Sequence, residues 1–104
     1  MRGSIVIYPF PHTDLSVAKP RPSFIIKKLA GVDAISCLIT TQGTSPHAIT
    51  LTQNDIETGG LRNDCFVRPD RLFTADTEKF IKTVCTLKEK KVNEIIQAVI
   101  QLIS

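Results

Sequence analysis

The chain has 104 residues, of which 42% are hydrophobic and 22% charged, with five glycines and six prolines. This length suits a single domain over residues 1–104, and this composition excludes collagen-like, low-complexity and disordered chains. The formal net charge is +3. Its surplus lies in the first 33 residues, which is compatible with an anionic partner but common in proteins that bind no nucleic acid.

Targeting and redox signals are weak. No apolar stretch approaches the roughly 20 residues that a membrane span needs, and the run at residues 5–8 ends at Pro9, too short for a secretory signal. We therefore expect a cytoplasmic protein that does not contact a membrane. The cysteines at 37, 65 and 85 form no CxxC pair, which suggests reduced, mostly buried thiols rather than disulfides or a zinc site.

Six short runs rich in β-branched residues predict strands. They occupy residues 5–8, 24–26, 35–39, 48–51, 65–67 and 80–86. Strands this short and numerous indicate a barrel or a sandwich. We expect loops at residues 9–22, 42–47 and 54–64. The first contains four prolines and is long for so small a domain, and long loops are often functional.

The hydrophobic pattern changes its period near the end of the chain. Apolar residues recur at three- and four-residue intervals from Val92 to Ile103, with polar residues between them, which predicts an amphipathic helix. Thr86 and Glu89 form a capping-box pattern at its start. The apolar stripe must be buried, either against the sheet or against a second copy of the chain.

No familiar catalytic motif is present. The sequence contains no GxxxxGK[ST], GxGxxG, HExxH or GxSxG pattern, which removes the motif-based cases for nucleotide binding, zinc proteolysis and α/β-hydrolase chemistry. An enzyme with this sequence would need a small constellation of polar side chains.

Two arginines have stiffened backbones. Arg21 and Arg68 each precede a proline, which favours an extended conformation and aims the guanidinium with less loss of entropy, as a phosphate site requires. Asp70 lies two residues after Arg68, so both side chains project to one side of an extended segment. They form either part of a site or an exposed salt bridge of little energetic value.

Other candidates lie where strands give way to loops. Thr40 and Thr41 follow an apolar strand, a position from which a hydroxyl can bind a phosphate oxygen. His12 and His47 are the only histidines, and both fall in predicted loops. Either is an acid or base near pH 7 or a surface imidazole.

Taken together, five blocks of the sequence resemble the MazF/PemK family of toxin endoribonucleases in order and spacing. The resemblance extends from Gly3 through the C-terminal helix. The blocks are Gly3-Ser4-Ile5-Val6, Lys19-Pro20-Arg21-Pro22-Ser23-Phe24-Ile25-Ile26, Ile39-Thr40-Thr41-Gln42, Gly59-Gly60-Leu61 and Val67-Arg68-Pro69-Asp70-Arg71-Leu72-Phe73-Thr74.

The resemblance implies an SH3-like β-barrel of the CcdB/PemK/MazF type that forms a homodimer. It implies sequence-selective cleavage of single-stranded RNA such as mRNA, by attack of the 2′-hydroxyl, with no metal or other cofactor. It also implies a cognate antitoxin that masks the RNA-binding face. The alternative is a CcdB-like toxin that binds a protein target such as gyrase, or a dimeric module without catalysis.

The same resemblance assigns the catalytic residues. Arg21 and Thr40 match residues implicated in catalysis, and Arg68 and Asp70 match a pair proposed as acid and base. We assign Asp70 as the base and Arg21 and Thr40 as phosphate stabilisers. Arg68 is assigned to stabilisation before proton donation, because a guanidinium holds its proton too tightly.

RNA binding is expected from four further residues, His12, Lys19, Thr41 and Gln42, because loop side chains splay and stack individual bases. His12 is the only counterpart of a loop histidine found in some family members. The family's acidic residue after the first glycine is replaced by Ser4, which removes one carboxylate from that block.

Overall fold

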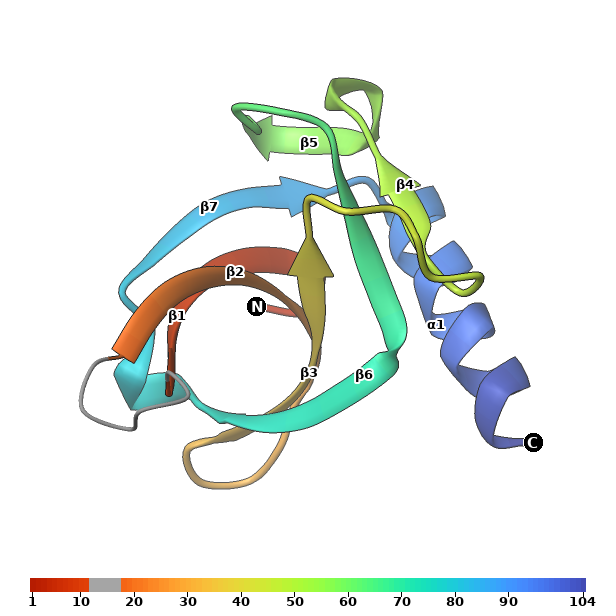
Figure 1. Ribbon diagram of the computed structural model, residues 1–104. Coiled ribbons are helices and arrows are strands. Elements are labelled where there is room, and N and C mark those ends of the chain that lie inside the picture. The colour runs from red at the N-terminus through yellow and green to blue at the C-terminus, as the bar shows by residue number, and fades with distance from the viewer. Residues whose placement is uncertain (12–17) are drawn as a thin grey trace.

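In the described part of the chain, residues 1–11 and 18–104 of a computed structural model, seven antiparallel strands form one curled sheet and a helix follows the last strand (Figure 1). Along the sheet the order is β4-β6-β3-β2-β1-β7-β5. The predicted class, mainly β with a C-terminal helix, is confirmed, and the sheet forms a half-barrel. The bounds are β1 Ser4–Pro11, β2 Ala18–Lys28, β3 Asp33–Thr40, β4 Ile49–Leu51, β5 Ile56–Gly59, β6 Cys65–Asp76, β7 Lys82–Leu87 and α1 Glu89–Ile103, with short 3₁₀ turns η1 Gln53–Asp55 and η2 Thr77–Lys79.

The loop predicted over residues 9–22 is wrong at both ends, because β1 and β2 extend across its prolines as a two-stranded arm. The carbonyl of Ile7 accepts from the Ile81 N–H at 2.9 Å, so the backbone of Ile7 points away from β2. Opposed residues in an antiparallel pair alternate between bonded and non-bonded positions. Pro9, Pro20 and Pro22 therefore occupy non-bonded positions, where a missing N–H breaks no hydrogen bond.

Strand β6 is nine residues longer than the predicted strand over 65–67. It pairs with β3 as Leu38↔Arg68 and then as Cys37↔Leu72, so residues 69–71 have no partner in β3 and form a bulge. Pro69 in this bulge is fully buried, whereas Asp70 is exposed. The bulge thus anchors one residue in the core and turns its neighbour outward.

Strand β5 lies within a segment predicted as a loop, and it pairs with β7. Gly59 ends this strand with φ +84°, and a Cβ there would lie 2.5 Å from the Val84 carbonyl oxygen. Only glycine fits this approach, so β5 ends at a position that another residue type would not occupy without strain.

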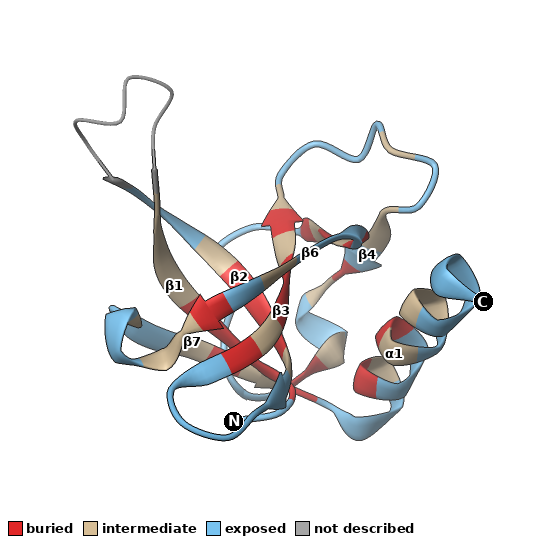
Figure 2. Cartoon of the chain, turned by 90° about the horizontal axis from the view of Figure 1, so that it is seen from below, coloured by how far each residue is buried: buried red, intermediate tan, exposed pale blue. Residues whose placement is uncertain are grey.

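The sheet is buried on both faces near its centre. Adjacent residues Ile5 and Val6 are 0% and 1% exposed, although they point to opposite faces. The larger core lies partly under α1, which has buried residues in its first half and exposed residues at its C-terminal end (Figure 2). All three cysteines are free and buried, as expected. The main core contains Ile5, Phe24, Cys37, Ile39, Leu51, Ile56, Cys65, Val67, Cys85, Leu87, Val92 and Ile95.

The predicted helix is present, but its predicted cap is wrong. Thr86 belongs to β7 and pairs with strands on both sides, and the residue before the helix is Lys88, whose side chain makes no capping bond. Leu87 is buried, and its N–H donates to the Gly3 carbonyl at 2.9 Å. Strand pairing therefore continues through the position where the capping pattern predicted a helix start.

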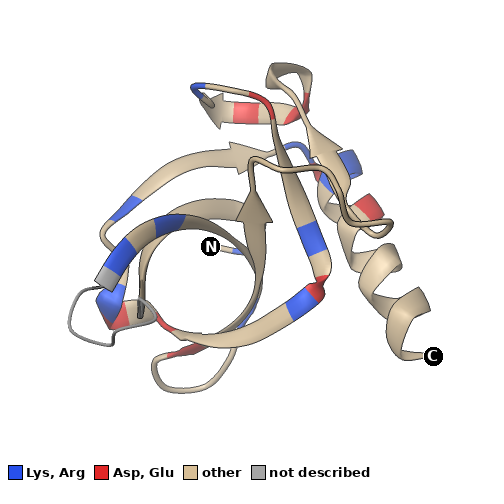
Figure 3. Ribbon diagram, in the orientation of Figure 1, with Lys and Arg blue, Asp and Glu red and all other residues tan. Residues whose placement is uncertain are grey.

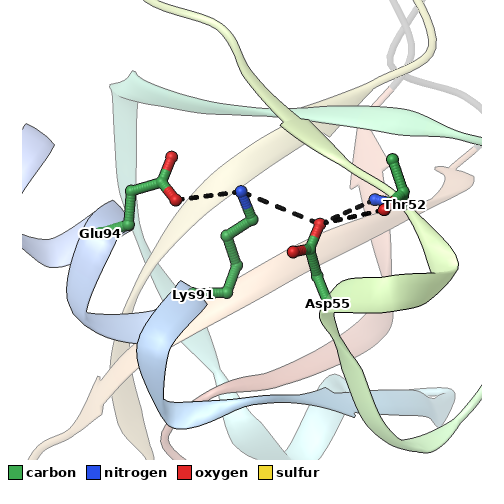
Figure 4. A network of polar contacts seen from close by, with 4 residues as sticks. All are labelled: Thr52, Asp55, Lys91 and Glu94. Carbon is green, nitrogen blue, oxygen red and sulfur yellow. Dashed lines mark hydrogen bonds and ion pairs between the residues drawn. The ribbon is translucent and has the colours of Figure 1, made fainter.

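A polar network holds the start of α1 against η1 (Figure 4). The Lys91 Nζ lies 3.1 Å from a Glu94 oxygen and 3.8 Å from Asp55 Oδ2. The same Asp55 oxygen accepts from the Thr52 N–H at 2.9 Å, and the Lys88 N–H donates to the Asp55 carbonyl at 2.8 Å. Helix and turn are thereby tied together.

Candidate active site

A cavity of about 480 Å³ lies at the end of β3. Lys19, Arg21 and Pro22 of β2 form one side, and the segment from Ile39 to Gln42, with Cys65, forms the rest. Arg21 and Thr40 thus line one cavity, together with Lys19, Thr41 and Gln42. Cys65 also lines the cavity, a position that no sequence signal indicated.

Strand pairing explains why Arg21 and Thr40 meet. Ser23 pairs with Leu38, and continuing this register by two residues brings Arg21 beside Thr40. The pairing of Tyr8 with Arg21 holds the arginine backbone from the other side. Tyr8 is itself fixed, because its ring packs 5.6 Å from that of Phe73 and its hydroxyl accepts from the Asp76 N–H at 3.1 Å.

The Thr40 hydroxyl is oriented by the backbone that follows it. Its Oγ1 accepts from the Gln42 N–H at 3.1 Å, as in the turns that Thr forms with a residue two positions later. This bond uses a lone pair and leaves the hydroxyl proton free to be donated. Thr40 can therefore donate to an oxygen atom of a ligand in the cavity.

Arg68 and Asp70 form an ion pair, one of the two outcomes that their spacing left open. The Arg68 Nε lies 2.9 Å from one Asp70 oxygen and Nη2 lies 2.7 Å from the other. Both side chains are about a quarter exposed, at 23% and 24%. The hydrogen bonds from Arg68 lower the pKa of Asp70, and those to Asp70 raise the pKa of Arg68. Asp70 is thus ionised at neutral pH, and Arg68 is a still weaker proton donor than a lone arginine.

This pair does not line the cavity, but it lies close to it in the sheet. Arg68 sits opposite Leu38, which precedes Thr40 by two residues and therefore shares its face of β3. The backbones of β2 and β6 flank β3 at about one strand spacing each, roughly 10 Å apart in total. Basic residues accordingly lie on both sides of the end of β3 (Figure 3).

The structure describes only one of the two histidines, because His12 lies outside the described residues. His47, for which the sequence left open an acid, a base or a surface imidazole, is exposed in the turn before β4, where its N–H donates to the Ser45 hydroxyl at 3.2 Å.

The chemistry of this site is that of an anion site with titratable neighbours. Lys19 and Arg21 are exposed, and within residues 1–11 and 18–104 no carboxylate forms an ion pair with either. Two cations beside a donating hydroxyl suit a phosphate group. In the same described residues, no group of three His, Cys, Asp or Glu side chains is placed to hold a metal ion, and no helix is long and apolar enough to cross a membrane.

A family model matches residues 1–103, and it is described as PemK-like, MazF-like toxin of type II toxin-antitoxin system. No curated protein was found that matches the sequence.

Several solved structures resemble the whole chain. An endoribonuclease from Mycobacterial species superimposes with a TM-score of 0.71 at 17% identity, covering 97% of this chain and 88% of that one. An endoribonuclease in complex with its cognate antitoxin, also from Mycobacterial species, gives 0.72 at 17% identity, with 97% and 91% covered. MazE-MazF from Deinococcus radiodurans gives 0.71 at 16% identity, with 98% and 92% covered. At these identities the likeness shows the fold.

Proposed function

The chain belongs to the PemK-like, MazF-like family of toxins of type II toxin-antitoxin systems, and on this premise we propose that it is an endoribonuclease that cuts single-stranded RNA without a metal ion. The observation that carries the proposal is that Arg21 and Thr40 line one cavity, with the Arg68–Asp70 pair one strand away. The names of the structural relatives support the same activity.

The proposed reaction uses the 2′-hydroxyl of the RNA as nucleophile. Asp70 takes the 2′-hydroxyl proton, and the 2′ oxygen bonds to phosphorus while the bond from phosphorus to the 5′ oxygen breaks. Arg21, Thr40 and Arg68 stabilise the charge that develops on the phosphate oxygens. The departing 5′ oxygen takes a proton from water, and the products are a 2′,3′-cyclic phosphate or 3′-phosphate and a 5′-hydroxyl.

The raised pKa of Arg68 supports its assignment to stabilisation, because raising this pKa makes proton donation still less favourable. The lowered pKa of Asp70 keeps its carboxylate ionised, as a base requires. It also makes Asp70 a weak base while Arg68 holds both oxygens. RNA phosphate competes for the Arg68 guanidinium, which would loosen the pair and raise the proton affinity of Asp70.

RNA recognition is assigned to the cavity rim. Lys19 contributes a phosphate contact, and Thr41 and Gln42 present hydrogen-bonding groups to bases or sugars. His12 is retained as a fourth RNA-binding residue on the family resemblance alone. Selection among RNA sequences would then come from the residues around this rim.

We propose a cytoplasmic homodimer that is inhibited by a cognate antitoxin. The distal end of α1 supports an interface, because Ile100, Leu102 and Ile103 are 43%, 40% and 73% exposed, and adjacent exposed apolar side chains are typical of a covered surface. Light scattering on the purified protein should give twice the mass of the chain. An antitoxin that occupies the cavity should block RNA cleavage in proportion to its concentration.

The direct test is cleavage of labelled single-stranded RNA by the purified protein in EDTA. We expect cleavage with 5′-hydroxyl ends, and losses of about 10²-fold or more for Arg21→Ala and for Asp70→Asn. Lys90→Gln, an exposed substitution on α1, serves as the control. Intact RNA, or both variants cutting at the wild-type rate, would overturn the proposal, and gyrase poisoning with intact RNA would favour the protein-binding alternative.

A further inference from the structure

Four aromatic rings, from β1, β6 and the turn before β7, form one cluster. The ring centroids of Tyr8 and Phe10 lie 5.3 Å apart, and they lie 5.6 and 5.1 Å from that of Phe73. The ring of Phe80 lies 6.1 Å from that of Tyr8. Each of the four residues is only partly buried. The cluster therefore keeps accessible ring surface outside the core.

The two cations of the cavity are direct neighbours of this cluster. Tyr8 pairs with Arg21, and Phe10 pairs with Lys19. Directly opposed residues of an antiparallel pair project to the same face, with their Cβ atoms about 4.5–5.5 Å apart. Both cations are exposed and line the cavity. Each of them thus has an aromatic side chain beside it on the same face of the sheet.

The proposed catalytic residues lie on that face as well. Ser23, two residues after Arg21, pairs with Leu38 of β3. Leu38 in turn pairs with Arg68 of β6 and precedes Thr40 by two residues. Alternate residues of a strand project to the same face. The residues that hold the phosphate and the aromatic cluster therefore share one side of the sheet.

The helix covers the other side. Phe73 reaches the aromatic face from β6, because it pairs with Ser36, two residues before Leu38. Helix α1 packs on the opposite face, with the core that contains Phe24. The smaller core of the aromatic face has Phe80 packed against it and, among the described residues, contains no residue of the helix. In this part of the chain, α1 thus leaves the rings uncovered.

Tyr8 holds the cluster in place. Its ring contacts all three others, and its hydroxyl accepts from the Asp76 N–H at 3.1 Å. Phe10 and Phe73 meet edge to face at an interplanar angle of 65°, an arrangement that aromatic pairs prefer. These contacts order the rings before any ligand arrives, so binding to them loses little conformational entropy.

We propose that Phe10 and Phe73 bind an unpaired RNA base by stacking, next to a phosphate held by Lys19 and Arg21. The inference rests on the proposed endoribonuclease function and adds a base site to it. Aromatic side chains beside a basic groove bind single strands in this way, because every base has a π-face. The site also favours unpaired RNA, since a base inside a double helix has no free face to offer.

The test measures the binding of a short RNA that spans a mapped cut site and carries fluorine in place of every 2′-hydroxyl, so that it is bound but not cut. The variants are Phe10→Leu, Phe73→Leu and Phe80→Leu, since leucine keeps an apolar side chain but lacks the flat ring. Phe80→Leu is the matched control, because this ring belongs to the same cluster but packs against the smaller core. We expect Kd to rise about 10-fold for the first two variants and to stay unchanged for the control.

A second measurement separates stacking from a change in the fold. The same RNA is made with one base at a time removed. At the stacked position, this removal should weaken binding to the wild type by about 10-fold and binding to Phe10→Leu by much less, because the ring and the base act as a pair.

Wild-type affinity in both Phe10→Leu and Phe73→Leu overturns the base site, even where the wild type cuts RNA. Equal losses in the wild type and Phe10→Leu at every position of the RNA also overturn it, because the ring then contacts no base. Failure of the wild type to cut any RNA instead removes the endoribonuclease proposal itself, and the base site with it.

Discussion

Replacing Gly43 with alanine should lower RNA cleavage without unfolding the protein. The added Cβ would lie 2.6, 2.7 and 3.1 Å from Phe66 Cζ, Cε1 and Cε2. Because Cζ lies on the axis of the ring, rotation of the ring about that axis does not relieve the overlap. Ordinary contact begins at 3.4 Å, so the segment that joins β3 to β4 and the Phe66 ring must move apart by about 0.8 Å. An error near 1 Å in a catalytic position costs up to about 10²-fold in rate.

The assay is the rate of cleavage of a single RNA at saturating enzyme, together with the melting temperature. Gly43→Ala should be roughly 10- to 100-fold slower, with little change in melting temperature, because Gly43 lies in an exposed segment. Gly60→Ala is the matched control, since its Cβ would approach only the flexible end of Gln53, at 3.1 Å. Phe66→Leu, combined with Gly43→Ala, should restore the rate by making room. A wild-type rate for Gly43→Ala, or no recovery in the double variant, would refute the reasoning.

Two further predictions concern stability. Leu51→Ala removes a side chain that is 0% exposed and should lower the free energy of unfolding by about 2–5 kcal/mol, measured by urea denaturation. Thr50→Ala should change the free energy of unfolding by less than about 0.5 kcal/mol. Equal effects of the two substitutions would contradict the assignment of the core. Burial raises the pKa of Cys37 to about 12 and those of Cys65 and Cys85 to about 11, so a thiol reagent at pH 8 should react slowly until guanidinium is added. The cysteine thiols of the unfolded chain ionise first, near pH 9.0. The free energy of unfolding should therefore fall as the pH rises above that value. Rapid reaction of the folded protein with the thiol reagent would contradict the burial.

The sequence predicted the centres of the strands better than their ends. Ile5, Phe24 and Cys37 lie in apolar runs whose burial depends on residue type alone, and all three are 0% exposed. The extent of β1 and β2 could not be predicted from Pro9 and Pro20, because a proline ends a strand only where its N–H is needed. Whether the N–H is needed depends on which neighbouring strand it faces, and the sequence of one segment does not contain that information.

The candidate site, too, could be predicted from the sequence only in part. The Arg68–Asp70 ion pair is one of the two outcomes that a spacing of two residues left open, and it is present, whereas its role in catalysis stays a prediction. The proximity of Arg21 and Thr40 was predicted only through the family resemblance, because it depends on the register of β2 against β3.

The bulge in β6 connects the stability of the fold to the geometry of the site. Pro69 cannot donate to the ladder, so pairing with β3 is interrupted after Arg68. Its ring is fully buried, and the core therefore fixes where the chain leaves the sheet. Asp70 lies in this bulge, directly after the buried ring, and forms its ion pair with Arg68 there. The backbone position of the proposed base is thus tied to the apolar packing of the residue before it, and a residue at position 69 that let β3 and β6 pair without interruption would change that position even in a stable protein.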